Sequence, residues 1–108
     1  MNQEQSLAVA MQLIMYGGEA KSCAMEAIKA AKAGDGELAN KKLGQADEAL
    51  LEAHHAQTDL LTREAQGQET PLHLFLIHGQ DHLMTSIAFV DLAREIVDLH
   101  QKLLSNQH

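Results

Sequence analysis

The sequence predicts an all-α protein, an antiparallel bundle of three long helices. Alanine, leucine, glutamate, glutamine, lysine and methionine dominate the chain, and these residues favour helices. Apolar residues recur every three or four positions over three long segments, which is the period of an amphipathic helix. The chain holds one proline, two phenylalanines and one tyrosine, which is a poor composition for a β-sandwich. Its 108 residues are the length of one small domain, spanning 1–108.

The first helix is expected at about residues 3–33. Asn2 can cap its start, and Gly34 follows its end, where a glycine commonly terminates a helix. Its apolar face is predicted to hold these residues: Leu7, Ala10, Met11, Ile14, Ala24, Met25, Ile28 and Ala31. Gly17-Gly18 interrupts the pattern, and because glycine lowers helix propensity, the pair marks either a kink or a close contact with another helix.

The second helix is expected at about residues 37–66, after a turn at Asp35-Gly36. Its apolar stripe alternates spacings of four and three, as at the seam of a helical bundle. The stripe runs through Ala39, Leu43, Ala46, Leu50, Ala53, Gln57, Leu60 and Glu64. Gly67 is expected to end this helix.

The third helix is expected at about residues 71–104, with Thr70 as its cap and Pro71 at its first position. It carries two apolar stripes. One stripe comprises Leu74, Ile77, Met84, Ala88, Leu92 and Leu99, and the other comprises Leu76, Leu83, Ile87, Val90 and Val97. A helix that is apolar on several sides is buried on several sides, so this helix is expected to line a subunit interface unless the second helix covers both stripes.

Asp81 lies in the middle of the first of these stripes. A buried carboxylate without a partner is costly, so it takes up a proton or binds a cation. In a symmetric oligomer the copies of Asp81 would meet near the axis, where like charges need a metal ion or a shared proton. The alternative is a carboxylate that water or a hydroxyl of the same chain satisfies.

A histidine cluster on the third helix is the main chemical signal. His78, Asp81, His82 and Thr85 have the spacing of one helix flank. A neutral imidazole is a nucleophile that can accept a phosphoryl group, and a carboxylate one turn away can fix its tautomer. The same spacing resembles a helical zinc motif, and histidines without any chemistry are the third interpretation. Three residues of the second helix are candidates for a further metal ligand: His54, His55 and Glu64.

Composition excludes several other classes. The formal charge of −7, without a basic run, is unfavourable for binding nucleic acid. Cys23 is the single cysteine, so no disulfide forms within the chain, and a small buried residue is its simplest interpretation.

No apolar run approaches the ~18 residues that cross a membrane, and the first residues lack the basic segment of a secretory signal. The expected location is the cytoplasm, and the remaining histidines are expected to be solvated: His73, His100 and His108.

The segment Leu76–Thr85, with the sequence Leu-Ile-His-Gly-Gln-Asp-His-Leu-Met-Thr, resembles an active-site segment of a known family. This is the lactose/cellobiose-type enzyme IIA family of the bacterial phosphoenolpyruvate-dependent sugar phosphotransferase system, the PTS. Glu52-Ala53-His54 followed by Gln57-Thr58 is also similar, as is Tyr16-Gly17-Gly18 followed by Ala20. The resemblance covers about residues 5–104.

The resemblance implies three helices per subunit, assembled as a nine-helix homotrimer. It implies that His78 carries a phosphoryl group, that His82 and Gln80 support it, and that Gln57 contributes as a further candidate. The copies of Asp81 would hold a divalent cation, expected to be Mg²⁺, at the trimer axis.

The partners that the resemblance implies are HPr, which donates the phosphoryl group, and a cysteine of enzyme IIB, which receives it. Enzyme IIB with IIC then phosphorylates a disaccharide of the cellobiose/β-glucoside or lactose type. This makes the chain a phosphotransferase component. The alternative is a non-catalytic metal-binding or scaffold bundle that uses His78, Asp81 and His82.

Overall fold

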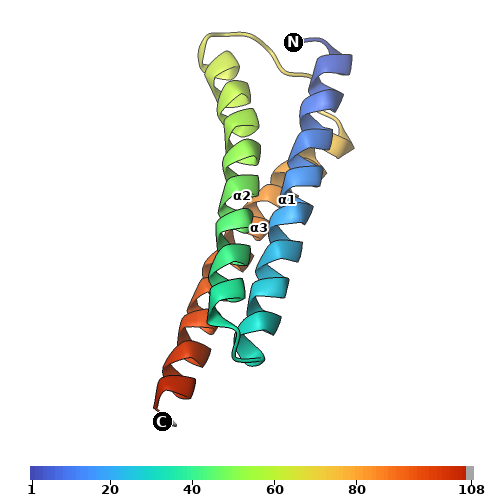
Figure 1. The fold of residues 1–108 in the computed structure, drawn as a ribbon. Coiled ribbons are helices and arrows are strands. Elements are labelled where there is room, and N and C mark those ends of the chain that lie inside the picture. Colours follow the sequence, from blue (N-terminus) through green and yellow to red (C-terminus); the bar gives the residue numbers. More distant parts are fainter. Residues whose placement is uncertain (107–108) are drawn as a thin grey trace.

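The structure, a computed structural model, describes residues 1–106, so His108 lies outside the described residues. Three helices make up the fold: α1 (Gln3–Lys32), α2 (Gly36–Ala65) and α3 (Leu74–Ser105). They form an up-down-up bundle, in which α2 runs antiparallel to the other two helices (Figure 1). The bundle is slender, with extents of 59 × 20 × 17 Å. The predicted all-α, three-helix fold is confirmed.

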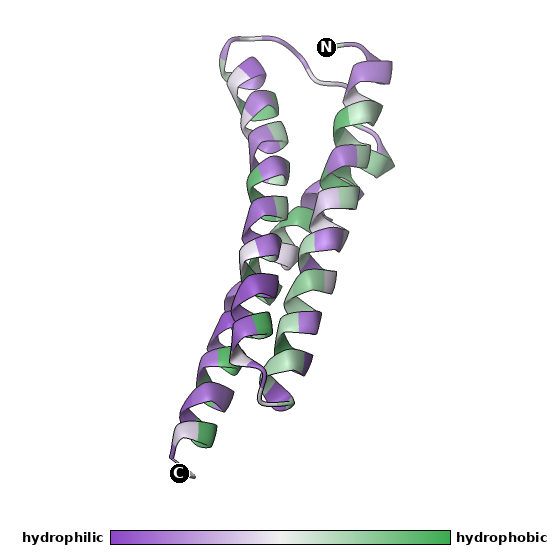
Figure 2. Cartoon of the chain, viewed as in Figure 1, coloured by the Kyte–Doolittle hydropathy of each residue, from purple (hydrophilic) through white to green (hydrophobic). Residues whose placement is uncertain are grey.

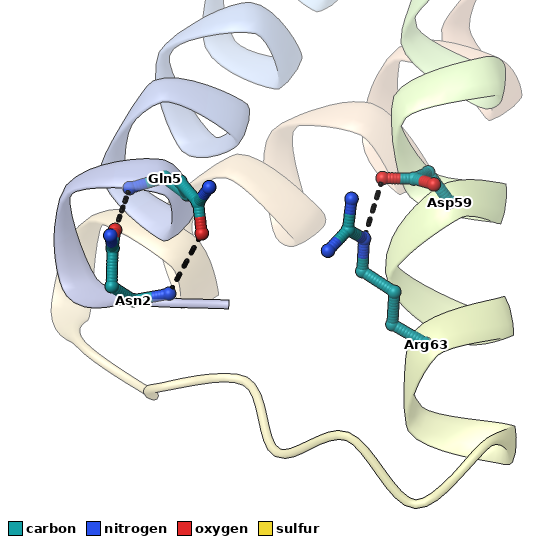
Figure 3. Close-up of polar contacts among 4 residues, drawn as sticks. All are labelled: Asn2, Gln5, Asp59 and Arg63. Atoms are coloured by element: carbon teal, nitrogen blue, oxygen red, sulfur yellow. Dashed lines mark hydrogen bonds and ion pairs between the residues drawn. The ribbon is translucent and has the colours of Figure 1, made fainter.

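Local sequence sets both ends of α1. The side chain of Asn2 accepts a hydrogen bond from the backbone N–H of Gln5 at 2.8 Å, and the side chain of Gln5 accepts one from the backbone N–H of Asn2 at 2.9 Å (Figure 3). Lys29 and Lys32 lie in the last turn, where cations complement the helix dipole. Gly34 takes a φ of +83°, so the residues predicted to begin and end this helix do so.

A carboxylate caps α2. The side chain of Asp35 accepts a hydrogen bond from the backbone N–H of Leu38 at 3.1 Å, which makes Gly36 the first residue of the helix. The prediction that Gly36 belongs to the turn is therefore wrong by one residue. Within the helix, Arg63 Nε donates to Asp59, one turn earlier, at 3.1 Å (Figure 3). Gly67, with a φ of +83°, follows the helix end as predicted.

The start of α3 differs from the prediction. The cap is His73, whose Nδ1 accepts a hydrogen bond from the backbone N–H of Leu76 at 3.2 Å, so Thr70 is not the cap and Pro71 is not the first helical residue. Ser6 of α1 donates its hydroxyl proton to the carbonyl of Pro71 at 3.0 Å, and its oxygen lies 3.0 Å from His73 Nε2. These contacts with α1 keep the segment before Leu74 out of the helix, so α3 begins three residues later than expected. His73 is half-buried, so the prediction that it is solvated is wrong.

Small residues form most of the core. Most buried apolar side chains are alanines, and the largest fully buried ones are Leu13, Leu83, Val90 and Val97. Alanine lets helices approach closely but removes little apolar surface from water. Helix α1 packs extensively on both other helices, whereas α2 and α3 contact each other much less. Figure 2 shows hydrophilic colour over much of the visible face of α2.

The apolar face predicted for α1 is partly wrong. Ala10, Ala24 and Ala31 are buried as predicted, and Cys23 is only half-buried. Three predicted members are exposed: Leu7, Met11 and Met25. The side of α1 that turns inward carries the smaller residues Ser6, Ala10, Gly17, Ala20 and Ala27 along with Leu13. Close approach of the helices, rather than side-chain size, decides which side of α1 faces the core.

The stripe predicted for α2 faces the core, except at its last member. Ala39, Leu43, Ala46, Ala53 and Leu60 are buried, and Leu50 and Gln57 are half-buried. Glu64 is exposed, so the stripe ends near Leu60. Within residues 1–106, none of the helices is long and apolar enough to cross a membrane.

The two apolar stripes predicted for α3 have different surroundings. Leu76, Leu83, Val90 and Val97 are buried in the bundle, and Ile87 is half-buried. The other stripe is uncovered, and five of its large side chains are each more than half exposed: Leu74, Ile77, Met84, Leu92 and Leu99. Helix α2 therefore does not cover both sides of α3 within one chain.

Candidate functional site

Two histidines lie one turn apart on α3, on the flank that faces α1. The ring centroids of His78 and His82 are 5.8 Å apart and their planes are inclined by 24°, so the rings stack. His78 is exposed, whereas His82 is half-buried. A partner protein can therefore reach the ring of His78, and the ring of His82 packs against one side of it.

The glycine pair of α1 makes room for His82. A Cβ atom at Gly17 would lie 3.0 Å from His82 Cδ2 and 3.0 Å from Ser86 Oγ, and one at Gly18 would lie 3.5 Å from His82 Nε2. Helix α1 runs unbroken through both glycines. The pair therefore marks a close contact between α1 and α3, the second of the two alternatives that the sequence left open.

A second close contact lies beside His78. Gly79 is buried against α1, where a Cβ atom would lie 3.1 Å from the carbonyl oxygen of Ala10 and 3.2 Å from Leu13 Cβ. Together, Gly79 and Gly17 set a short spacing between α1 and α3 next to each histidine. The backbone of α3 is thus held rigidly where the histidines project from it.

Hydroxyl groups fix the backbone of α3 at His82. Ser86 Oγ donates to the carbonyl of Gly17 at 3.0 Å and also lies within hydrogen-bond distance of the carbonyl of His82. Thr85 Oγ1 donates to the carbonyl of His82 at 3.2 Å and accepts a hydrogen bond from Lys21 Nζ at 3.1 Å. The sequence predicted Thr85 on this flank, but Lys21 was missed. Its place one turn after Gly17, on the same side of α1, is the signal that could have identified it.

The pKa of His82 lies below the ordinary histidine value. Burial against α1 is the largest cause, followed by the ammonium of Lys21 and the neighbouring ring of His78. The carboxylate of Asp81 opposes these effects. His82 therefore stays neutral to a lower pH than a free histidine, with one N–H donor and one acceptor nitrogen.

The two predicted glutamines lie on the opposite flank of α3. Gln57 Nε2 donates to Gln80 Oε1 at 2.7 Å and lies 3.8 Å from Met84 Sδ. Positions 78 and 80 are about 200° apart around a helix, so Gln80 faces α2 while His78 lies toward α1. Gln80 also lines an apolar groove of about 300 Å³ between α2, α3 and the connecting segment. Within one chain, the structure does not bring Gln57 or Gln80 to His78.

Asp81 lies on the uncovered stripe of α3. Its carboxylate is exposed in the single chain, so the burial expected from the sequence requires a second copy. In the part of the chain that the structure describes, no three histidine, cysteine, aspartate or glutamate side chains come together as a metal site. The α2 candidates His54, His55 and Glu64 therefore do not complete a zinc site with the histidines of α3.

Comparison with known proteins decides the family. The family of the PTS lactose/cellobiose-specific IIA subunit has a sequence model that matches residues 8–101. The chain belongs to this family. The resemblance first indicated by the Leu76–Thr85 segment is thereby confirmed, and it extends over nearly the whole length of this IIA chain.

Individual relatives agree with this assignment. The lichenan-specific phosphotransferase enzyme IIA component of Bacillus subtilis (strain 168) is 48% identical over 103 residues, which is 95% of this IIA chain and 93% of the relative. The crystal structure of the PTS cellobiose-specific enzyme IIA from Bacillus anthracis superimposes with a TM-score of 0.90 at 43% identity, covering 97% of this chain and 94% of that one.

A third relative was solved together with another protein. A chain in the solution structures of the IIA(Chitobiose)–HPr complex of the Escherichia coli phosphotransferase system has a TM-score of 0.77 at 42% identity, covering 89% of this chain and 93% of that one. The names of the three relatives refer to different sugars. The comparisons therefore establish a phosphotransferase-system protein with a role in phosphoryl transfer, without specifying a sugar.

Proposed function

We propose that this IIA chain is a phosphocarrier, in which His78 accepts a phosphoryl group from phospho-HPr and passes it to a cysteine of the cognate enzyme IIB. The observation that carries this proposal is the exposed ring of His78, stacked on a half-buried His82. The solved relative in complex with HPr supports HPr as the donor. Enzyme IIB with IIC then uses the phosphoryl group for uptake of a disaccharide of the cellobiose/β-glucoside or lactose type.

Phosphoryl transfer at His78 follows from the chemistry of the ring. An unprotonated ring nitrogen forms a bond to phosphorus with its lone pair, and the bond from phosphorus to the donor atom of HPr breaks, with the donor atom keeping the electron pair. In the second transfer, the cysteine sulfur of IIB forms a bond to phosphorus and the ring nitrogen leaves with its electron pair. A neutral imidazole serves as nucleophile in the first step and as leaving group in the second.

His82 has a supporting role in this proposal. Its neutral ring carries one N–H, which can donate a hydrogen bond to an oxygen of a phosphoryl group on His78. Gln80 and Gln57 face the other flank of α3, so they support the transfer only if a neighbouring subunit brings them to His78.

HPr and IIB bind in turn at one overlapping surface, because each must reach the same ring. Leu74 and Phe75, which are both exposed near the start of α3, supply apolar contact area for that surface. Binding of this kind places the donor and acceptor atoms in line, which is the main requirement of phosphoryl transfer.

The part of the uncovered α3 stripe from Ile77 to Leu99 supports a homotrimer of nine helices with Asp81 facing the axis, and Leu74 at its outer end stays accessible to HPr and IIB. An apolar stripe of this length is unfavourable in water, and burial against two further copies removes it from solvent. Three converging carboxylates offer the hard oxygen ligands that suit Mg²⁺, and the ion offsets their mutual repulsion. The ion has a structural role here and takes no part in the step at His78.

Phosphorylation by phosphoenolpyruvate, enzyme I and HPr tests the carrier function. We expect one acid-labile phosphate per chain in the wild type and none in His78→Ala, with unchanged helix content because His78 is exposed. His82→Ala is expected to be slower but active. An inactive His82→Ala together with an active His78→Ala would reverse the assignment.

A further inference from the structure

The ion pairs of the chain leave one lysine near the histidines without a carboxylate. In residues 1–106, four basic side chains pair with acidic ones: Lys42, Arg63, Arg94 and Lys102. Lys21 is in no ion pair among these residues, although the chain carries a formal charge of −7. Its ammonium donates instead to the neutral hydroxyl of Thr85 at 3.1 Å. Its positive charge is therefore not compensated by a bound carboxylate.

The hydrogen bond to Thr85 holds this charge on the histidine flank of α3. Thr85 lies three residues after His82 and seven after His78, so the three side chains share one side of the helix. Lys21 itself is half-buried on α1, one turn after Gly17. Its charge acts on the ring of His82, where it contributes to the lowered pKa.

A phosphoryl group at His78 needs such a charge. The group carries up to two negative charges, and transfer is stabilised by positive groups that are in place before the reaction. The other side chains of this flank do not supply a permanent positive charge, because an imidazole is largely neutral at pH 7 and Asp81 is acidic. The net charge of the chain adds to the repulsion of the incoming group.

We propose that Lys21 is a further residue of the phosphoryl-transfer site and supplies the positive field that stabilises the phosphoryl group on His78. The inference rests on the proposed carrier function. Contact between the ammonium and the phosphoryl oxygens is not required, because the field of a charge is only partly screened by salt within about one Debye length. Thr85 fixes the ammonium in place, so little reorganisation is needed when the phosphoryl group arrives.

Charge-removing variants of the full chain test this proposal. Lys21→Met removes the charge and keeps the aliphatic stem, and Lys21→Gln is a second variant in case the first fails to fold. We expect transfer from phospho-HPr to be slower by about five- to tenfold in both, from a single charge acting at this range. Lys21→Arg keeps the charge and Lys29→Met makes the same change in net charge elsewhere on α1, so both are expected to stay within about twofold of wild type.

Two further measurements separate a field from a structural role. ³¹P NMR follows the pKa of the phosphoryl group on His78, which we expect to rise in Lys21→Met, because the negative form loses a favourable charge. Thr85→Val loses the hydrogen bond but keeps the ammonium, and is expected to slow transfer less than Lys21→Met. The proposal is overturned by a wild-type rate in Lys21→Met, by equal slowing in Lys29→Met, or by equal slowing in Thr85→Val. Phosphate uptake by His78→Ala would instead contradict the carrier function itself.

Discussion

Substituting Gly79 by alanine adds one methyl group where α1 and α3 approach most closely beside His78. The new Cβ atom would lie 3.1 Å from the carbonyl oxygen of Ala10 and 3.2 Å from Leu13 Cβ, and neither atom can rotate away without moving α1. Alanine raises helix propensity by about 1 kcal/mol, whereas overpacking a buried site costs about 1–3 kcal/mol. We expect a net loss of about 1 kcal/mol in the free energy of unfolding.

Gly44→Ala is the matched control. Gly44 is an exposed position of α2 with no atom within 4 Å of an added Cβ, so the same substitution is expected to gain about 1 kcal/mol from helix propensity alone. Urea unfolding followed by circular dichroism, at one fixed protein concentration, measures both variants. A Gly79→Ala protein that is as stable as Gly44→Ala would refute the close contact between α1 and α3.

Three other predictions concern single side chains. Asp81→Leu is expected to remain folded and trimeric and to become insensitive to chelator, because it replaces a charge by apolar packing. Sedimentation with and without chelator measures this, and dissociation of the variant into monomers would contradict it. His73→Ala is expected to lose about 1 kcal/mol of stability with the helix cap, and His73→Asn to retain part of it, as measured by thermal unfolding. Because the pKa of His82 is lowered in the folded protein, the unfolded chain binds more protons than the folded chain in mild acid. The free energy of unfolding is therefore expected to fall as the pH drops through about 6.5, the ordinary histidine value. His82→Ala is expected to weaken the dependence of the melting temperature on pH over this range.

Much of the fold could be predicted from local sequence. The apolar period located three helices, and Asn2, Gly34 and Gly67 marked helix ends through their own backbone preferences. The start of α3 could not be predicted in this way. Thr70-Pro71 is a good local start signal, but Ser6, more than sixty residues earlier in the chain, binds Pro71 and His73 and sets the start at Leu74.

The sequence predicted the part of the candidate site that lies on α3, but it missed the residue that α1 contributes. The spacing of His78 and His82 placed them together because both lie on one helix. Lys21 was missed because the large apolar residues of α1 do not mark the side that meets α3, and the glycines that do mark this side were left open between a kink and a close contact. Gln80 was grouped with His78 through the family resemblance, although two positions that are two residues apart on a helix point to opposite flanks.

The position of the phosphoryl group is the most direct test of the carrier function. NMR of protein with ¹⁵N-labelled histidine, phosphorylated by phosphoenolpyruvate, enzyme I and HPr, detects coupling between phosphorus and the ring nitrogen that carries it. We predict coupling at one ring nitrogen of His78 and at no other histidine of the chain. Coupling at His82 or at any other histidine, or a protein that takes up no phosphate, would contradict the account.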